Sequence, residues 1–279
     1  MWSDQLDELE ALVVVHERFP DLAARGLRAI HGGWDTHAFV VDEAWIVRVP
    51  RRPDAEAQLL QEVELLRCVA AFLPSRVPAI ERVSRETPVC VVARWIYGTP
   101  ATASPRTAAE LGSFLKVLHG LPVESLPVPP STVADWRAQH EVRRSQFEAS
   151  VFPLLDVDER HRAADLFSSV HFEFEPALVH GDLCPDHVLC APDGHIEAVI
   201  DWGDARSGDP AIDLAWPLHG ASPAFAEAVL GTYGDVAEEV LVRARFYYRR
   251  GPWYEVLYGL ETGRPEFVQD GLAGVRARL

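Results

Sequence analysis

The first hundred residues show a pattern of apolar and polar positions that is typical of a small sheet with packed helices. Apolar residues recur at helical spacing over residues 4–18 and again after Pro53, and this spacing predicts two amphipathic helices. Short apolar runs, separated by glycine or by acidic turns, have the character of strands. We expect these strands at residues 27–31, 38–41, 45–49, 79–83 and 89–94.

From residue 98 onward the pattern is mainly helical. Ser104 followed by Pro105 is a typical helix start, because serine can cap the helix and proline fits its first turn. The expected elements are a loop over residues 121–130, helix over 134–170, short strands at 177–179 and 196–200, and two or three helices over 210–279.

This change of pattern predicts an α+β fold of two lobes, with the bilobal outline of a protein kinase. Residues 1–96 would form a small β-rich lobe, and residues 97–279 would form a larger, mainly helical lobe. Such an outline does not by itself define a function.

Composition and charge narrow the classes of partner. The 279 residues include 26 basic and 42 acidic side chains, which gives a net charge of −16. A surface that negative repels nucleic acid and anionic membranes and attracts cationic small molecules, although a role in solubility is the simpler explanation of the charge alone. The four cysteines have no C-x-x-C spacing, and no segment resembles a membrane span or a signal peptide. We expect a cytoplasmic monomer without nucleic-acid or membrane partners.

The segment from His180 to Asp213 carries the most chemistry. It reads HGDLCPDHVL from His180, IDWGDA from Ile200, GDP from Gly208 and DLA from Asp213. Phosphoryl transfer requires one carboxylate that faces the acceptor hydroxyl and others that hold Mg²⁺ against the phosphates. Asp182 follows one short apolar strand and Asp201 ends the next, so a β-hairpin between them would bring the two carboxylates side by side.

Each residue of this segment also has a structural explanation. Asp182 and Asp201 could be ordinary turn aspartates, but the joint pattern makes that improbable. For His180 we favour a buried histidine that bonds the backbone around the loop. For Asp209 and Asp213 we favour capping or bracing of the loop over catalysis.

The segment resembles the catalytic core of the aminoglycoside phosphotransferases, a family of antibiotic kinases. The D-H-[VI]-L and I-D-[FW]-G-D-A patterns are closest to the 2″-phosphotransferase and macrolide phosphotransferase branch. The resemblance implies that Asp182 is the base-like catalytic residue and that His187 and Asp201 are ligands of Mg²⁺. It also implies a nucleotide-binding N-terminal lobe and a C-terminal lobe for catalysis and substrate binding.

Arg48 is the main departure from the family pattern. It stands in the strand where many relatives have a phosphate-binding lysine, and the resemblance pairs it with Glu62 of the following helix. Arginine keeps the positive charge and can bind phosphate with two N–H groups, but its geometry is fixed. The alternative is that Arg48, with its neighbours, forms only a solvated basic edge.

Two further segments are nucleotide-binding candidates. Gly33 and Thr36 would belong to a loop over the phosphates, since glycine permits close backbone approach and threonine can bond a phosphate oxygen. A plain hairpin turn is the alternative. The linker residues Ala93, Arg94 and Ile96 would offer backbone groups to the purine edge.

The acceptor is the least defined part of the prediction. We expect the γ-phosphate of ATP or GTP to pass to a hydroxyl of a small antibiotic, an aminoglycoside first, which would confer resistance. Trp253, Glu255 and Tyr258, with Asp182, would contact the substrate. The stretch after Asp213 has no acid before Glu227, which weakens the aminoglycoside assignment. The alternatives are a macrolide or cationic peptide antibiotic kinase, a choline-like metabolic kinase and a nucleotide-binding pseudokinase.

Overall fold

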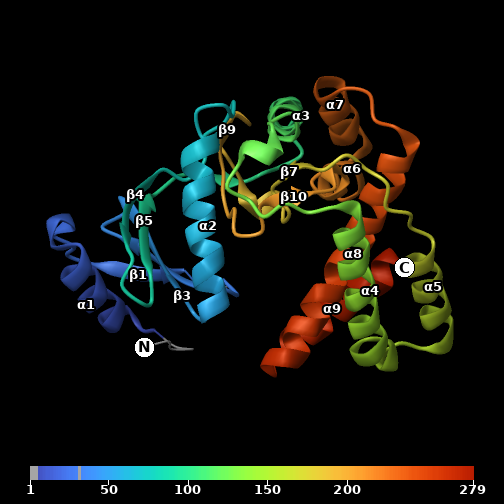
Figure 1. Ribbon diagram of the computed structural model, residues 1–279, viewed down its shortest axis with the longest axis horizontal. Coiled ribbons are helices and arrows are strands. Elements are labelled where there is room, and N and C mark those ends of the chain that lie inside the picture. Colours follow the sequence, from blue (N-terminus) through green and yellow to red (C-terminus); the bar gives the residue numbers. More distant parts are fainter. Residues whose placement is uncertain (1–5, 31–32) are drawn as a thin grey trace. The chain divides into compact units, whose positions relative to one another are not determined.

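The computed structural model describes residues 6–30 and 33–279 and divides the chain into two compact units (Figure 1). The N-terminal unit comprises Met1–Ala101, Ser125–Val128 and Pro185–Ala205, and the C-terminal unit comprises Thr102–Glu124, Pro129–Cys184 and Arg206–Leu279. The sequence predicted one boundary after residue 96, with all later residues in the C-terminal lobe. In the structure, Pro185–Ala205, which carries His187 and Asp201, groups with the N-terminal unit instead.

The N-terminal unit is built on a five-stranded antiparallel sheet in the order β1-β2-β3-β5-β4. All five predicted strands are present, with ends within two residues of expectation where described. The elements are α1 (Glu8–Arg18), η1 (Pro20–Leu22), β1 (Leu27–Ile30), β2 (Thr36–Val41), β3 (Trp45–Pro50), α2 (Pro53–Val69), β4 (Ile80–Ser84) and β5 (Cys90–Arg94). The predicted helix start at residue 4 and His31 lie outside the described residues.

Side chains alternate between the two faces of this sheet, and each face packs on one helix. One face packs on α1 through Val15, Phe19, Val41, Val47, Val49, Cys90 and Val92. The other packs on α2 through Leu59, Val63, Val89 and Val91. Arg48 lies between Val47 and Val49 in β3, and it therefore faces α2.

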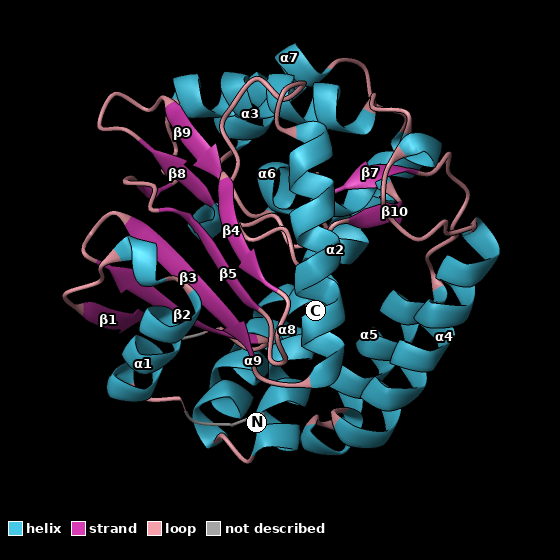
Figure 2. Ribbon diagram, turned by 60° about the vertical axis from the view of Figure 1, so that its left-hand side comes forward, coloured by secondary structure: helices cyan, strands magenta, loops and turns pink. Residues whose placement is uncertain are grey.

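A second, three-stranded sheet of the N-terminal unit contains the predicted hairpin (Figure 2). It consists of β6 (Thr99–Pro100), β8 (Val188–Cys190) and β9 (Ile196–Val199), with the turn η4 (Pro185–His187) directly before β8. Gly194, with φ of 82°, makes the turn between β8 and β9, where a side chain would be strained.

The C-terminal unit is mainly helical. Its elements are α3 (Pro105–His119), η2 (Val123–Ser125, at its boundary), α4 (Val133–Ser150), η3 (Phe152–Leu154), α5 (Val157–Ser168), β7 (Ala177–Val179), β10 (Arg206–Gly208), η5 (Pro210–Ile212), α6 (Ala215–His219), α7 (Pro223–Tyr233), α8 (Glu238–Thr262) and α9 (Pro265–Arg278). β7 and β10 pair antiparallel.

Two predictions for this unit were wrong in detail. The expected helix over 134–170 is divided into α4 and α5, because Pro153 cannot continue a helix and Asp156 caps a new one. Residues 210–279 contain α6, α7, α8 and α9 rather than two or three helices. The prediction missed the short α6 and the separation at Gly263, whose φ of 67° ends α8.

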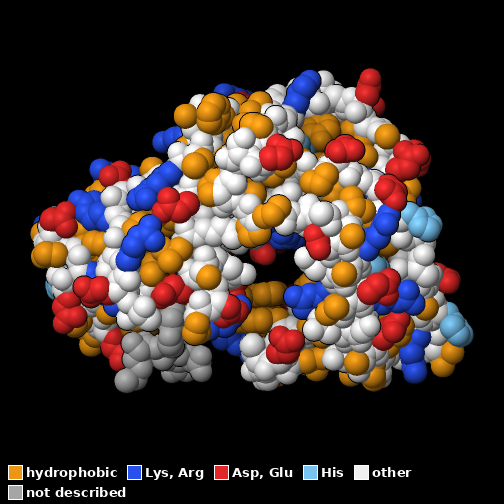
Figure 3. Space-filling view, in the orientation of Figure 1, with side chains coloured by type: hydrophobic (Ala, Val, Ile, Leu, Met, Phe, Trp, Pro, Cys, Tyr) orange, Lys and Arg blue, Asp and Glu red, His pale blue; other side chains and the backbone are white. Residues whose placement is uncertain are grey.

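Acidic and basic side chains are intermixed on the visible surface of each unit (Figure 3). Among the described residues, no helix combines the length and the apolar character that crossing a membrane requires.

Candidate active site

Arg48 and Glu62 form a buried ion pair in the N-terminal unit. The Nη1 of Arg48 donates to Oε1 of Glu62 at 2.5 Å, and the Glu62 side chain is only 2% exposed. Thr36 lies on the same face of the sheet, and its Oγ1 is 3.5 Å from Nε of Arg48. The alternation of β3 and the middle of α2 thus bring together Arg48, Thr36 and Glu62. The pairing of Arg48 with Glu62 agrees with the one that the family resemblance implied.

Burial and neighbouring charges act on this pair in opposite directions. Burial alone would lower the pKa of Arg48, but the carboxylates of Glu62 and Asp201 raise it above its usual value. Burial raises the pKa of Glu62, and Asp201 adds to the rise while Arg48 opposes it. The second Glu62 oxygen, Oε2, is buried without a hydrogen-bond partner among the residues that the structure describes. The cluster therefore holds more negative charge than one arginine neutralises.

Asp201 and His187 lie next to this pair. Oδ1 of Asp201 is 3.8 Å from Nη2 of Arg48, and its Oδ2 is 3.4 Å from Nε2 of His187. The backbone N–H of Ile200 donates to the His187 carbonyl at 2.9 Å. This bond joins the backbone of His187 to the residue directly before Asp201. Asp201 has φ of 64°, an uncommon conformation for a residue with a side chain, and about half of its side chain is exposed. Strained residues of this kind cluster at functional sites.

The donor set suits a metal that is shared with a ligand. Within the described ranges, no group of three or more His, Cys, Asp or Glu side chains is arranged to hold a metal ion by itself. Mg²⁺ usually takes only one or two protein carboxylates and completes its shell with water and substrate phosphates. One carboxylate and one imidazole beside the Arg48 guanidinium therefore fit a metal that is shared with a phosphate ligand.

The loop that carries Asp182 belongs to the C-terminal unit and is held by a buried carboxylate. Asp213 is fully buried and accepts the backbone N–H of His180 at 2.7 Å and of Gly181 at 2.9 Å. Burial alone would raise the pKa of Asp213, but its bond to His119 and the nearby His180 hold it below the usual value. Asp182 itself is exposed after this braced turn. This geometry agrees with bracing as the role of Asp213.

His180 is fully buried, as expected for a structural histidine. Its Nδ1 accepts the backbone N–H of Asp182 at 3.4 Å. The imidazole of His180 therefore contacts the loop backbone at the amide group of Asp182.

Sequence reasoning missed the residues behind this loop. His119, at the end of α3, bonds Oδ2 of Asp213 at 3.1 Å and the Tyr233 hydroxyl at 2.9 Å. Burial raises the pKa of Tyr233 to about 12, with Asp213 adding to the rise. His119 lies 94 residues before Asp213, and no local motif connects them.

Asp209 is the centre of a second buried network. It caps η5 through the N–H of Ala211, and Arg243 donates to both of its carboxylate oxygens, at 2.6 and 3.3 Å. The Tyr247 hydroxyl lies 3.1 Å from Oδ2 and also accepts the indole N–H of Trp136 at 2.7 Å. Asp209 thus connects α4 and α8 to the start of η5, and bracing agrees with its geometry.

The candidate phosphate loop is only partly described, whereas the linker is described throughout. Gly32 lies outside the described residues. A Cβ at Gly33 would stand 2.8 Å from the Thr36 carbonyl oxygen, so this position requires glycine. Ala93 and Arg94 end β5, and the Arg94 guanidinium lies 3.9 Å from the Trp45 ring centre, while Ile96 follows in the linker. A nucleotide role for these linker residues stays a prediction.

The predicted substrate residues on α8 divide into two groups. Trp253 has no exposed area and packs among Phe147, Phe152 and Phe167, so it belongs to the core rather than to a substrate pocket. That part of the prediction was wrong because buried residues lie on several faces of α8, so its sequence does not show which aromatic side chain faces the core. Glu255 and Tyr258 are half-buried on the same side of the helix, and burial raises the pKa of Glu255, with Asp270 adding to the rise.

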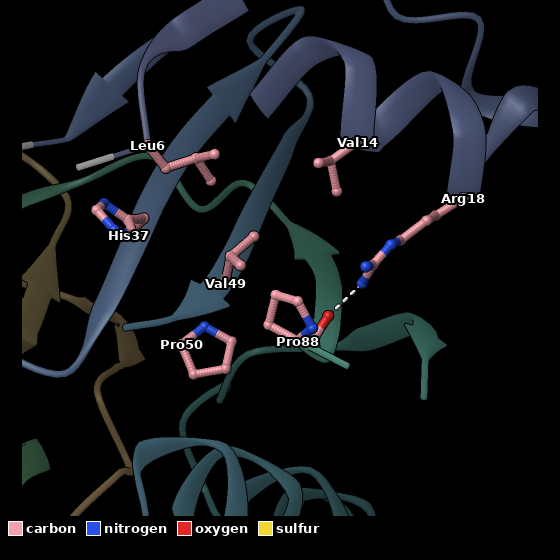
Figure 4. Close-up of a pocket in the computed structure, with 7 residues that line it drawn as sticks. All are labelled: Leu6, Val14, Arg18, His37, Val49, Pro50 and Pro88. Carbon is pink, nitrogen blue, oxygen red and sulfur yellow. Dashed lines mark hydrogen bonds between the residues drawn. The ribbon is translucent and has the colours of Figure 1, made fainter. Parts of the chain in front are cut away.

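A small cavity between α1 and the sheet lies apart from all of these residues. Its lining is mainly apolar and consists of Leu6, Val14, Arg18, His37, Val49, Pro50 and Pro88 (Figure 4). Arg18 bonds the carbonyl of Pro88 at its edge. None of the predicted site residues lines it, and we assign it no role in catalysis.

Comparison with known proteins decides the family. A family model described as the phosphotransferase enzyme family matches residues 26–247, well over half of the chain. The chain belongs to this family. Family membership confirms the resemblance drawn from the HGD and IDWGDA motifs and makes the chain a phosphotransferase.

Two curated relatives of this phosphotransferase act on antibiotics by name. The chain is 26% identical over 275 residues to a viomycin phosphotransferase of Streptomyces vinaceus, with 89% of this chain and 92% of that protein covered. It is 27% identical over 211 residues to an aminoglycoside 3′-phosphotransferase of Streptomyces ribosidificus, with 66% and 77% covered.

Solved structures confirm the kinase-like fold. The GDP and kanamycin complex of APH(2″)-IIIa superposes with a TM-score of 0.87 at 24% identity, covering 97% of this chain and 98% of that one. The apoenzyme of a macrolide 2′-phosphotransferase from Brachybacterium faecium superposes with a TM-score of 0.73 at 25% identity, covering 96% and 97%. The bilobal α+β prediction is therefore confirmed.

Proposed function

We propose that this phosphotransferase moves the γ-phosphate of ATP or GTP to a hydroxyl group of a small antibiotic and so confers resistance. The observation that carries the proposal is the cluster of Arg48, Glu62, His187 and Asp201 in one compact unit of a chain of this family. A phosphate-binding cation, a buried partner that orients it and two metal ligands are the parts that phosphoryl transfer needs.

Each residue of the cluster has a distinct task. Arg48 binds phosphate oxygens through its planar N–H groups, and Glu62 holds the guanidinium in place from α2. Thr36 and the backbone at Gly33 approach the phosphates from β2 and the turn before it. His187 and Asp201 hold a divalent metal, Mg²⁺ by expectation. When bound, the metal neutralises charge on the phosphates and orients them.

Asp182 acts on the acceptor. Its exposed carboxylate accepts a hydrogen bond from the substrate hydroxyl and receives its proton as the new phosphorus–oxygen bond forms. The bond from the γ-phosphorus to the β–γ bridging oxygen breaks, and the nucleoside diphosphate leaves. The bonds from Asp213 to the N–H groups of His180 and Gly181 orient the loop for this step.

An aminoglycoside is the proposed substrate class, since the net charge of −16 favours cationic compounds. A cationic cyclic peptide is the second candidate, because the viomycin phosphotransferase matches nearly the whole chain. Glu255 and Tyr258 are the proposed substrate contacts on α8. Macrolides, choline-like metabolites and loss of turnover stay open as alternatives.

The pseudokinase alternative is weakened by composition. The main argument for a pseudokinase was that Arg48 stands in place of a lysine. The chain, however, contains 25 arginines and one lysine, Lys116. An arginine at position 48 therefore follows the usage of the whole chain and does not mark a lost function.

A substrate screen tests the proposal. Purified protein would receive Mg²⁺ with ATP or GTP and, separately, aminoglycosides, viomycin-type cyclic peptides, macrolides and choline. Product formation would be followed by mass spectrometry as the gain of one phosphate. We expect phosphorylation of an antibiotic; activity on choline alone, or on none of the compounds, would contradict the proposal.

A further inference from the structure

The pair that we assign to the metal contains one nitrogen donor and one oxygen donor. Nε2 of His187 and Oδ2 of Asp201 are 3.4 Å apart within one compact unit. The His187 side chain is 17% exposed, and the bond from the Ile200 N–H to the His187 carbonyl fixes its backbone. Both donors are therefore presented by the hairpin itself.

Their separation fits neighbouring positions on one octahedral ion. With bonds of about 2.1 Å, adjacent ligands of such an ion are about 3.0 Å apart. The observed 3.4 Å is slightly longer, so a small displacement allows one ion to take both atoms, and an ion with longer bonds than Mg²⁺ needs less displacement.

Arg48 lies close to one of the two carboxylate oxygens of Asp201. Its Nη2 is 3.8 Å from Oδ1, while the opposite oxygen, Oδ2, faces His187. Asp201 therefore gives a metal one oxygen, and His187 supplies the second protein donor.

We propose that His187 makes this site select a first-row transition ion such as Mn²⁺ over Mg²⁺. Mg²⁺ prefers oxygen ligands and near-ideal geometry, whereas imidazole suits transition ions, whose affinities for such sites rise along the series that begins with Mn²⁺. The inference rests on the proposed function, because the remaining ligands would come from the nucleotide and water.

Electron paramagnetic resonance of Mn²⁺ tests the ligand directly. The full-length protein would be titrated with Mn²⁺ in the presence of a non-hydrolysable GTP or ATP analogue, and nitrogen hyperfine coupling to the bound ion would be measured. His187→Asn and His187→Gln each replace the imidazole by an amide. His195→Asn is the matched control, since His195 is an exposed histidine of the same hairpin. We expect imidazole coupling in the native protein and in His195→Asn, and its loss in both His187 variants.

The second measurement is metal preference. The dissociation constants of Mg²⁺ and Mn²⁺ for the nucleotide complex would be compared by competition, and thermal unfolding would verify that each variant is folded. We expect the preference for Mn²⁺ to fall about tenfold in the His187 variants, which corresponds to about 1.4 kcal/mol.

The outcomes separate this inference from the proposed function. If the nucleotide analogue and Mn²⁺ bind together but nitrogen coupling is absent, or the preference is unchanged in the His187 variants, the inference is overturned while nucleotide binding stands. If no metal-nucleotide complex forms with the native protein, both are overturned.

Discussion

Two regions of the molecule are built around carboxylates: the cluster of Arg48, Glu62, His187 and Asp201, and the loop brace formed by Asp209 and Asp213 with their buried partners. They differ in how completely the carboxylate oxygens are satisfied by hydrogen bonds. Asp209 and Asp213 are fully buried, and both of their oxygens accept hydrogen bonds. In the other region, Asp201 is half exposed and Oε2 of Glu62 is buried without a partner among the described residues.

This difference is the one we expect between structural and ligand-binding carboxylates. A buried polar group without a partner costs about 1–3 kcal/mol, and proteins retain few of them. Closed networks such as those of Asp209 and Asp213 fix backbone geometry, because both oxygens of each carboxylate already accept hydrogen bonds. The cluster at Glu62 and Asp201 keeps excess negative charge, which suits it to a metal ion.

The largest effect should come from Asp182, the exposed carboxylate that the brace presents. Asp182→Asn keeps the shape of the side chain but removes the proton acceptor. We expect kcat to fall by about 10²- to 10⁴-fold with nucleotide affinity unchanged. Asp186→Asn, at an exposed aspartate of the same loop, is the control and should retain activity. Equal losses in both variants would remove Asp182 from its role.

Arg243→Met should give the largest effect on stability. Arg243 is 3% exposed and is the only cation that bonds Asp209 within the described part of the chain. Breaking a buried pair by removing one partner costs about 3–5 kcal/mol, because the remaining charge is uncompensated. Urea unfolding would measure the change, with Arg245→Met, at an exposed position of the same helix, as control.

The double variant Asp209→Asn/Arg243→Met sharpens this test. It removes both charges, so we expect it to be more stable than Arg243→Met alone. Simple additivity of the two single changes would mean that the pair does not act as a unit.

The sequence could predict features that depend on short motifs or on elements adjacent in the chain. It could not predict contacts between residues that are far apart in the sequence. Strand alternation places Arg48 on the α2 face, and the pairing with Glu62 follows from elements adjacent in the chain. The HGD and IDWGDA motifs marked Asp182, His187 and Asp201 because each lies in a short local pattern. The roles of these residues stay predictions, whereas the fold and the family are confirmed.

The partners of the brace could not be predicted in the same way. His119, Tyr233 and Arg243 come from three different helices, and no local spacing relates them to Asp209 or Asp213. Trp253 was misassigned for a related reason. A helix that is apolar on several faces does not reveal from its sequence which aromatic residue points into the core.

Glu62→Gln should have a moderate effect, confined to the ligand-binding region. It removes the charge that holds Arg48 but keeps the size of the side chain. We expect nucleotide affinity to fall about tenfold, or about 1.4 kcal/mol. The loss of stability should be smaller than for Arg243→Met, because Arg48 is 19% exposed and keeps the Asp201 carboxylate 3.8 Å away. Isothermal titration with GTP and ATP would measure it, and Glu64→Gln, on the same helix, is the control. A large loss of stability with unchanged affinity would make Glu62 part of a closed network like that of Asp213.

The smallest effect is the pH dependence that Asp213 contributes. Its pKa is lowered in the folded protein, so the unfolded chain binds a proton more readily. The contribution of Asp213 is therefore fully present above its unfolded pKa of about 3.9 and is lost as the pH falls through the lower folded value. We expect the difference in unfolding free energy between the native protein and Asp213→Asn to be constant above about pH 5 and to shrink below about pH 4. Asp158→Asn, at an exposed helix position, is the control for the removal of one carboxylate elsewhere in the chain. A difference that stayed constant down to pH 3 would mean that Asp213 braces the loop through its shape alone and that its charge contributes nothing.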